Sequence, residues 1–174
     1  MKMTKVQAEA LTAFVVRESL PGEEWRPVVG YEATYAISSL GRVWSAPRPR
    51  TPGGLRATSY DKHGYPMVAL VQDGVQRKWR RHILVAAAFI GPRPDGMEIR
   101  HLDGSRDPRA DNLAYGTRSE NMRDMVRHGT HNYSSRTHCT RGHPFNDVNT
   151  YWHSGKRHCR ACRHEQYVKR RARK

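Results

Sequence analysis

The chain of 174 residues lacks the features that usually build one large hydrophobic core. Hydrophobic residues make up only 37%, phenylalanine occurs 3 times, and the mean hydropathy is −0.85. We therefore expect several small units, which below about 40 residues usually need a metal, a disulfide or a partner. The apolar stretch 11–16 is too short to cross a bilayer and lacks a cleavage site, so neither a membrane protein nor a secreted one is expected.

Cysteine is also scarce, and its three residues all lie near the C-terminus. An odd number argues against a complete disulfide framework. Their confinement to one segment predicts a local metal site in a reducing compartment, so a cytoplasmic location is expected.

Acidic residues are few, with 16 Asp and Glu against 31 Lys and Arg, which gives a net charge of +15 and a pI near 10.4. Such an excess attracts phosphate backbones in a salt-dependent way. A membrane surface is the alternative partner, but it would call for a basic helix with a broad apolar face. Because the charge is spread over most of the chain, we expect nucleic acid as the partner and no membrane.

Hydrophobic spacing predicts a helix from residue 1 to about 20, with Val6, Ala10, Phe14 and Val15 on one face, ended by a Pro-Gly pair. Short β-prone pieces follow. In one of them Tyr35 and Ile37 alternate with small residues, which predicts a half-buried strand.

The turn dipeptide Asp73-Gly74 lies between two β-prone runs and predicts a hairpin. A buried helix is expected over 82–90, a short strand over 97–101, and a helix over 117–126 that begins with a capping box. The expected units are an N-terminal helix (1–22), a modular β region (23–60), a catalytic core (61–130) and a basic tail (131–174).

The expected core carries His101, Asn112 and Asn121 at spacings that suit a strand, a loop and a helix. Phosphodiester cleavage assisted by a metal needs a base and a divalent ion. An imidazole that titrates near pH 6.5 can serve as the base, and an amide oxygen suits a hard ion such as Mg²⁺. The alternative is that these side chains only cap turns and loops. For His82, which precedes an apolar run, a structural role is the more common one.

This ordered set, with the run 81–89 before it, resembles the HNH nuclease motif of phage homing endonucleases. The resemblance implies an α+β fold with a ββα-metal (His-Me finger) core. It also implies that His101 is the general base, that Asn112 braces the loop, and that Asn121 binds catalytic Mg²⁺ or Mn²⁺.

The residue before the base histidine departs from that pattern. Many HNH enzymes carry an acidic metal ligand there, whereas this chain carries Arg100, which cannot bind a cation. Three explanations stay open. Another acid such as Asp103 or Asp124 completes the metal site, metal binding is weak, or the enzyme has lost activity. Arg100 is alternatively a ligand for the scissile phosphate.

Residues 24–45 resemble the nuclease-associated modular domain found ahead of HNH units, which implies a small β module on DNA. The candidate DNA contacts there are Arg26, Arg42, Arg48 and Arg50, and the alternative is a merely solvated face.

Four soft ligands near the C-terminus, Cys139, His143, Cys159 and Cys162, occur in two close pairs. This spacing predicts a structural Zn²⁺ site with no open position. His138, His158 and His164 are rival ligands at less suitable spacing. The basic residues that follow, above all Lys169, Arg170 and Arg171, are expected to form a helix against phosphates, or else a disordered charge run.

Together these features predict a DNA endonuclease of homing type, encoded by a phage or a similar element and acting in the host cytoplasm. It would cut double-stranded DNA to leave a 3′-hydroxyl and a 5′-phosphate, as a monomer that nicks or a weak dimer that cuts both strands. The alternative is a DNA-binding protein with a degenerate, non-catalytic HNH core. RNA binding is a weaker alternative, since no stacking platform stands out.

Overall fold

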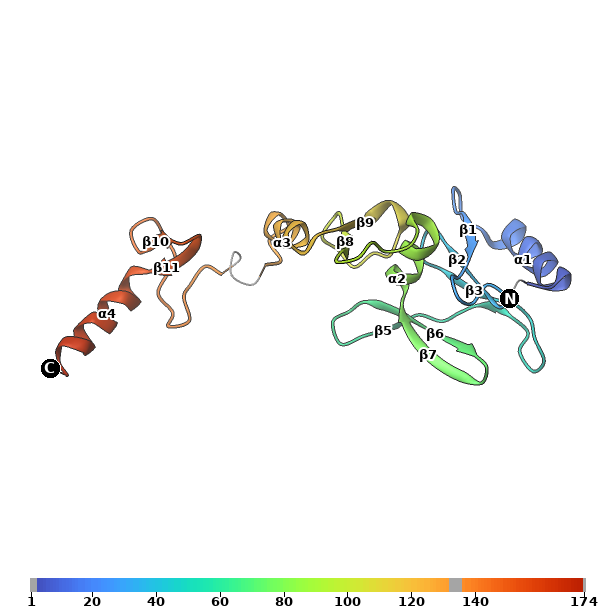
Figure 1. Ribbon diagram of the computed structural model, residues 1–174, viewed down its shortest axis with the longest axis horizontal. Helices are drawn as coiled ribbons and strands as arrows, with labels where there is room; N and C mark the ends of the chain where they lie inside the picture. The colour runs from blue at the N-terminus through green and yellow to red at the C-terminus, as the bar shows by residue number, and fades with distance from the viewer. Residues whose placement is uncertain (1–2, 132–135, 174) are drawn as a thin grey trace. The chain divides into compact units, whose positions relative to one another are not determined.

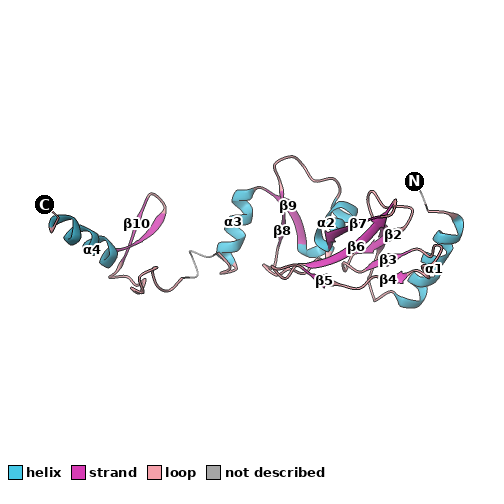
Figure 2. Ribbon diagram, turned by 90° about the horizontal axis from the view of Figure 1, so that it is seen from below, coloured by secondary structure: helices cyan, strands magenta, loops and turns pink. Residues whose placement is uncertain are grey.

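The computed structural model describes residues 3–131 and 136–173, and the chain divides into two units, residues 1–124 and 125–174 (Figure 1). Part of the polar stretch at the expected 130/131 boundary, residues 132–135, lies outside the described residues. Both units mix helices with short antiparallel strands (Figure 2), so the predicted α+β class is confirmed. None of the described helices is long and apolar enough to cross a membrane.

The N-terminal helix α1 (Lys5–Glu18) begins at a capping box, in which Thr4 and Gln7 satisfy each other's backbone N–H groups. It lies on the first sheet through Phe14, whose ring packs edge-on against Trp25 at 5.2 Å. The predicted apolar face is only partly right. Ala10 and Val15 pack beside Phe14, but Val6 is 69% exposed and lies outside this cluster.

The first sheet has the strand order β1 (Trp25–Pro27), β2 (Tyr35–Ser38), β3 (Val43–Ser45) and β4 (Gly54–Leu55), all antiparallel. We predicted that the strand holding Tyr35 and Ile37 would be half-buried, but all four of its residues are buried. The reason is that both faces of β2 are covered. Tyr35 and Ile37 enter the main core, while Ala36 packs in the smaller cluster with Phe14.

A second sheet of β5 (Ser59–Tyr60), β6 (Pro66–Gln72) and β7 (Val75–Arg80) contains the predicted hairpin. Its turn residues Asp73 and Gly74 both have positive φ, the conformation that two-residue hairpin turns require. The two sheets share one core, because Val68 and Leu70 of β6 join the buried residues of the first sheet.

The run after β7 forms α2 (Arg81–Val85) and continues as a π-helical turn (Ala86–Ile90), which ends at Gly91 with φ of 114°. A hairpin of β8 (Glu98–His101) and β9 (Leu113–Gly116) follows, and then α3 (Arg118–Arg127), whose first turn is capped by Thr117 and Glu120. This strand–strand–helix order is the expected ββα arrangement.

The second unit contains a hairpin of β10 (Thr150–His153) and β11 (Lys156–Cys159) and the helix α4 (Arg160–Arg171). Among its described residues only Cys159 is a buried hydrophobic residue. A unit this small therefore needs a source of stability other than an apolar core, such as a bound metal ion.

The Tyr35 hydroxyl joins the two sheets, since it accepts the Val71 N–H at 2.9 Å and a contact from Arg48 at 3.1 Å. Tyr35→Phe leaves these donors without a partner and should lower the free energy of unfolding by about 1–3 kcal/mol. The matched control Tyr60→Phe removes an exposed hydroxyl and should change it by less than about 0.5 kcal/mol. Urea unfolding followed by tryptophan fluorescence compares them, and equal effects would contradict the assignment.

Candidate nuclease site and metal centre

His101 is the last residue of strand β8, and its side chain is partly buried. Its Nε2 atom is buried and has no hydrogen-bond partner, so this nitrogen makes no hydrogen bond that stabilises the fold. The rings of Tyr65 and His82 pack beside it, at centroid distances of 5.8 and 5.0 Å. Burial lowers the pKa of His101, although the nearby Asp103 and Asp107 carboxylates oppose this shift. The ring is therefore neutral at pH 7 and can accept a proton.

His82 is buried on α2 and meets the His101 ring at an interplanar angle of 84°. Burial lowers its pKa to about 4, and the neighbouring His101 and Arg80 add to this effect. At physiological pH the His82 ring is thus uncharged and packs against the His101 ring.

Asn112 ties the β8–β9 loop together through its side-chain amide. Its Oδ1 accepts the Asp103 N–H at 3.0 Å, and its Nδ2 donates to the Asp107 carbonyl at 3.0 Å. The backbone carbonyl of Asn112 also accepts the Leu102 N–H. These bonds fix the segment that directly follows His101.

Asn121 lies in the first turns of α3 and contacts a carboxylate. Its Nδ2 atom lies 2.6 Å from Oε2 of Glu98, at the start of β8. The Glu98 side chain is 39% exposed, so solvent reaches this pair. An amide beside a carboxylate is a set of hard oxygen donors, which fits Mg²⁺ or Mn²⁺.

Arg100 makes an internal ion pair. Its Nη2 and Nε atoms lie 2.6 and 2.7 Å from Oδ2 of Asp124, which is buried on α3, and Glu120 lies 4.0 Å away. This is not the placement expected of a phosphate ligand, because the guanidinium is engaged with carboxylates. Asp124, one of the acids expected to complete the metal site, is engaged by the same pair.

The arginines proposed to contact DNA from the β module also have contacts within the protein. Arg42 pairs with the buried Glu23 at 3.0 Å, and Arg48 lies over the Tyr35 ring. Arg26 lies over the Phe89 ring and donates to the Ala88 carbonyl. Arg50 is exposed in a turn with φ of 65°. Arg26 and Arg50 are therefore the more accessible of the four.

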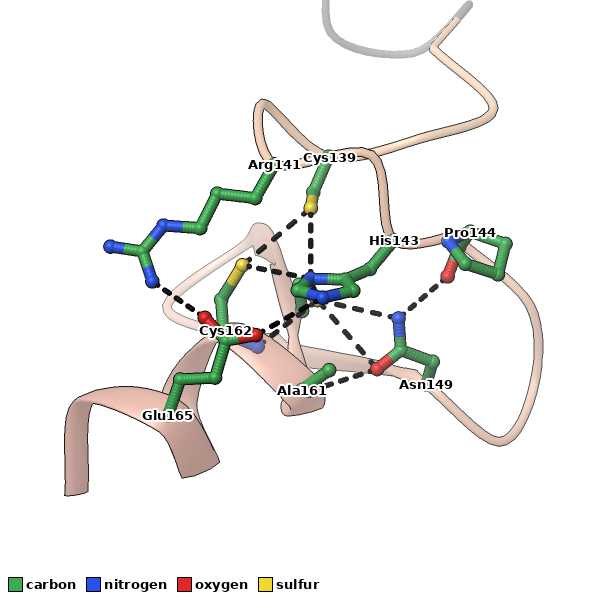
Figure 3. Close-up of polar contacts among 9 residues, drawn as sticks. Cys139, Arg141, His143, Pro144, Asn149, Ala161, Cys162 and Glu165 are labelled. Atoms are coloured by element: carbon green, nitrogen blue, oxygen red, sulfur yellow. Dashed lines mark hydrogen bonds and ion pairs between the residues drawn. The ribbon is translucent and has the colours of Figure 1, made fainter. Parts of the chain in front are cut away.

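In the second unit, Cys139, His143, Cys159 and Cys162 converge, with their ligand atoms all within 4.8 Å of one another (Figure 3). The Nδ1 atom of His143 lies 3.3 Å from the Cys162 sulfur and 3.5 Å from that of Cys139. The rival histidines His138, His158 and His164 lie outside this group. The cluster is therefore the four-ligand set that the spacing predicted.

Neighbouring groups hold the ligands in place. Glu165 lies 3.2 Å from Nε2 of His143, which leaves Nδ1 to face the sulfurs. Asn149 donates to the Cys159 sulfur and accepts the Ala161 N–H (Figure 3). Burial and the two neighbouring sulfurs raise the pKa of Cys162 to about 12. Three sulfurs and one imidazole this close form a ligand set that suits a soft cation such as Zn²⁺.

The positive charge is less evenly spread than we predicted. Residues 125–174 hold 12 of the 31 Lys and Arg but only 2 of the 16 acids. Lys169, Arg170 and Arg171 occupy the exposed last turn of α4, where they also complement the helix dipole. Nearer the metal cluster, Arg160 and Arg163 lie over the Tyr151 ring at 5.5 and 5.3 Å.

Two segments of the chain match family models. Residues 80–123 match the HNH endonuclease family, and residues 23–71 match the NUMOD4 motif. The DNA endonuclease I-HmuI of Bacillus phage SP01 is 30% identical over 112 residues, which are 64% of this chain and 62% of that protein. The chain thus contains an HNH endonuclease segment and a NUMOD4 motif, and it is similar to a phage HNH homing endonuclease.

A solved structure, "DNA binding and cleavage by the HNH homing endonuclease I-HmuI", agrees with this assignment. It is 28% identical with a TM-score of 0.57, and the match covers 64% of this chain and 63% of that one. The similarity thus spans less than two thirds of the relatives' length. The HNH match ends at residue 123, so the Cys/His cluster lies beyond it.

Sequence reasoning missed three residues of the HNH core. Tyr65 comes from the β5–β6 connection, which nothing in the sequence links to His101. Glu98 was overlooked, although strand alternation places it on the same face as Arg100. For His82 a structural role was expected to be the more common one, and its ring contacts that of His101.

The lowered pKa of His82 predicts a pH dependence of stability. The folded pKa lies below the unfolded value, so the unfolded chain binds the proton first and stability is lost as pH falls from about 6.5 to about 4. His82→Phe should remove up to about 3 kcal/mol of this loss. Urea unfolding across that pH range measures it, with the exposed His63→Phe as control. Parallel curves for wild type and His82→Phe would contradict the prediction.

Metal removal should unfold the second unit, because few buried apolar groups remain to hold it. We expect one zinc per chain, lost together with α4 helicity after chelation or in the Cys159→Ser/Cys162→Ser variant. His164→Gln, beside the cluster, should keep its zinc. Metal analysis and far-UV circular dichroism check both. Retention of stoichiometric zinc by the double variant would rule out this ligand set.

Proposed function

We propose that this chain is a DNA endonuclease that hydrolyses phosphodiester bonds of double-stranded DNA with the help of Mg²⁺ or Mn²⁺. The observation that carries the proposal is His101, a neutral histidine with an uncommitted ring nitrogen, held beside an Asn112-braced loop within the HNH segment. The similar protein I-HmuI is described as a homing endonuclease that binds and cleaves DNA.

His101 would take a proton from the attacking water, since burial lowers its pKa and keeps the base form available at neutral pH. Asn112 would fix the loop that follows it. Asn121 would hold the catalytic ion, which, when bound, would polarise the phosphate and stabilise the leaving oxygen. The expected products are a 3′-hydroxyl and a 5′-phosphate.

A structural Zn²⁺ is the ion that the Cys139, His143, Cys159 and Cys162 set suits best, because three sulfurs and one imidazole leave no open position. Its binding would order the basic helix α4. Since residues 125–174 carry most of the excess charge, this unit would supply sequence-independent affinity for DNA phosphates.

The accessible residues Arg26, Arg50, Lys169, Arg170 and Arg171 are the favoured DNA contacts. The chain would act as a monomer that nicks or as a weak dimer, and in the host cytoplasm if it is encoded by a phage.

A DNA-binding protein without catalysis is the second candidate. The observation that favours it is Arg100, which stands where many HNH enzymes carry an acidic ligand and which binds Asp124 instead. DNA binding would survive in such a protein, whereas cleavage would not.

Supercoiled plasmid incubated with Mg²⁺ or Mn²⁺ distinguishes the two candidates. We expect wild type to give nicked or linear product and His101→Ala to slow it by about 10²–10⁴-fold, the usual contribution of a general base. His153→Ala, which removes an exposed histidine of the second unit, should cut at the wild-type rate. A wild-type protein that shifts DNA in a gel but leaves the plasmid intact would decide for the non-catalytic candidate.

A further inference from the structure

The core is built around Arg100, so neither Arg100 nor Asp124 is available to a metal ion. Gly116 lies opposite Glu98 on β9, and a Cβ atom there would come 2.4 Å from Cδ of Arg100. The missing side chain is what gives the arginine its room. The guanidinium then neutralises the buried Asp124 carboxylate. Displacing it would remove a charge partner of a buried carboxylate, which is costly.

Glu98 is a carboxylate on the same face of the hairpin. Alternate residues of a strand share a face, so Glu98 and Arg100 both point toward α3, where they contact Asn121 and Asp124 respectively. The residue that meets the expected metal ligand Asn121 is therefore Glu98, two positions before Arg100. Asp103, the other acid expected to complete the site, is engaged by the N–H and the hydroxyl of Ser105.

The contact between Glu98 and Asn121 is a hydrogen bond, and its two polar atoms lie slightly closer than two oxygen ligands of one ion would. The polar atoms lie 2.6 Å apart, and the oxygen and nitrogen of an amide can exchange places by a flip. Two neighbouring oxygens in an octahedral Mg²⁺ shell, each about 2.1 Å from the ion, lie about 3 Å apart. Glu98 is also partly exposed, and its other oxygen lies 3.9 Å from Nη1 of the exposed Arg118, a contact that a bound ion would replace.

We propose that Glu98 supplies the carboxylate ligand of the catalytic ion, in place of the acid that Arg100 replaces. The ion is a hard divalent cation, Mg²⁺ or Mn²⁺, held by Glu98 and Asn121 with water and substrate phosphate in its other positions. This inference rests on the proposed nuclease function. It assigns Arg100 a structural task, which is to hold α3 against β8 while Glu98 carries the ligand charge.

Mn²⁺ binding by the zinc-loaded full chain, measured by electron paramagnetic resonance, tests the proposal without relying on activity. Glu98→Gln keeps the shape of the side chain but removes its charge, and should weaken Mn²⁺ binding at least tenfold. Glu9→Gln, which removes an exposed charge on α1, should bind as wild type does. Equal urea midpoints would show that all variants fold alike.

Relocating the carboxylate gives a second test. In the Glu98→Gln/Asn121→Asp double variant the acid stands on the other side of the same contact, so Mn²⁺ binding should recover. Wild-type affinity and wild-type cleavage in Glu98→Gln would overturn the Glu98 assignment alone. Absence of both Mn²⁺ binding and plasmid cleavage in wild type would overturn it together with the nuclease function.

Discussion

The ion pair between Arg100 and Asp124 is the interaction on which the arrangement of the HNH core depends. It joins the strand that carries His101 to the helix that carries Asn121, and the surrounding residues accommodate it. Gly116 provides space, and Glu120 adds a second carboxylate at 4.0 Å. A buried ion pair adds little net stability compared with apolar packing, but losing one partner is costly. Its effect here is positional, because it keeps Asp124 with Arg100 and leaves Glu98 as the carboxylate that contacts Asn121.

Each of the two units is stabilised internally in a different way. Residues 1–124 share one apolar core across two sheets, with α1 covering the outer face of the first. Residues 125–174 have almost no buried apolar residues among those described and instead gather three cysteines and a histidine. Residues 125–174 therefore depend on the Cys/His cluster, whereas residues 1–124 depend on apolar packing.

Local patterns predicted the elements well, because capping residues, the Asp73-Gly74 turn and the Cys/His spacing act over a few residues. The burial of β2 on both faces was not predictable in the same way, since it depends on α1 packing from far along the chain. The same limit applies to the site. The spacing predicted His101, Asn112 and Asn121 as site residues, but only the folded hairpin shows that Arg100 meets Asp124 and that Glu98 meets Asn121.

The central claim is that a hard ion binds at Glu98 and Asn121 while Arg100 stays with Asp124. A crystal structure of the zinc-loaded chain with Mn²⁺ and a DNA duplex, with anomalous data for both metals, tests it most directly. We predict a zinc peak among Cys139, His143, Cys159 and Cys162, and a manganese peak between Glu98 and Asn121. A manganese ion bound to Asp124, with Arg100 displaced onto a phosphate, would contradict the account.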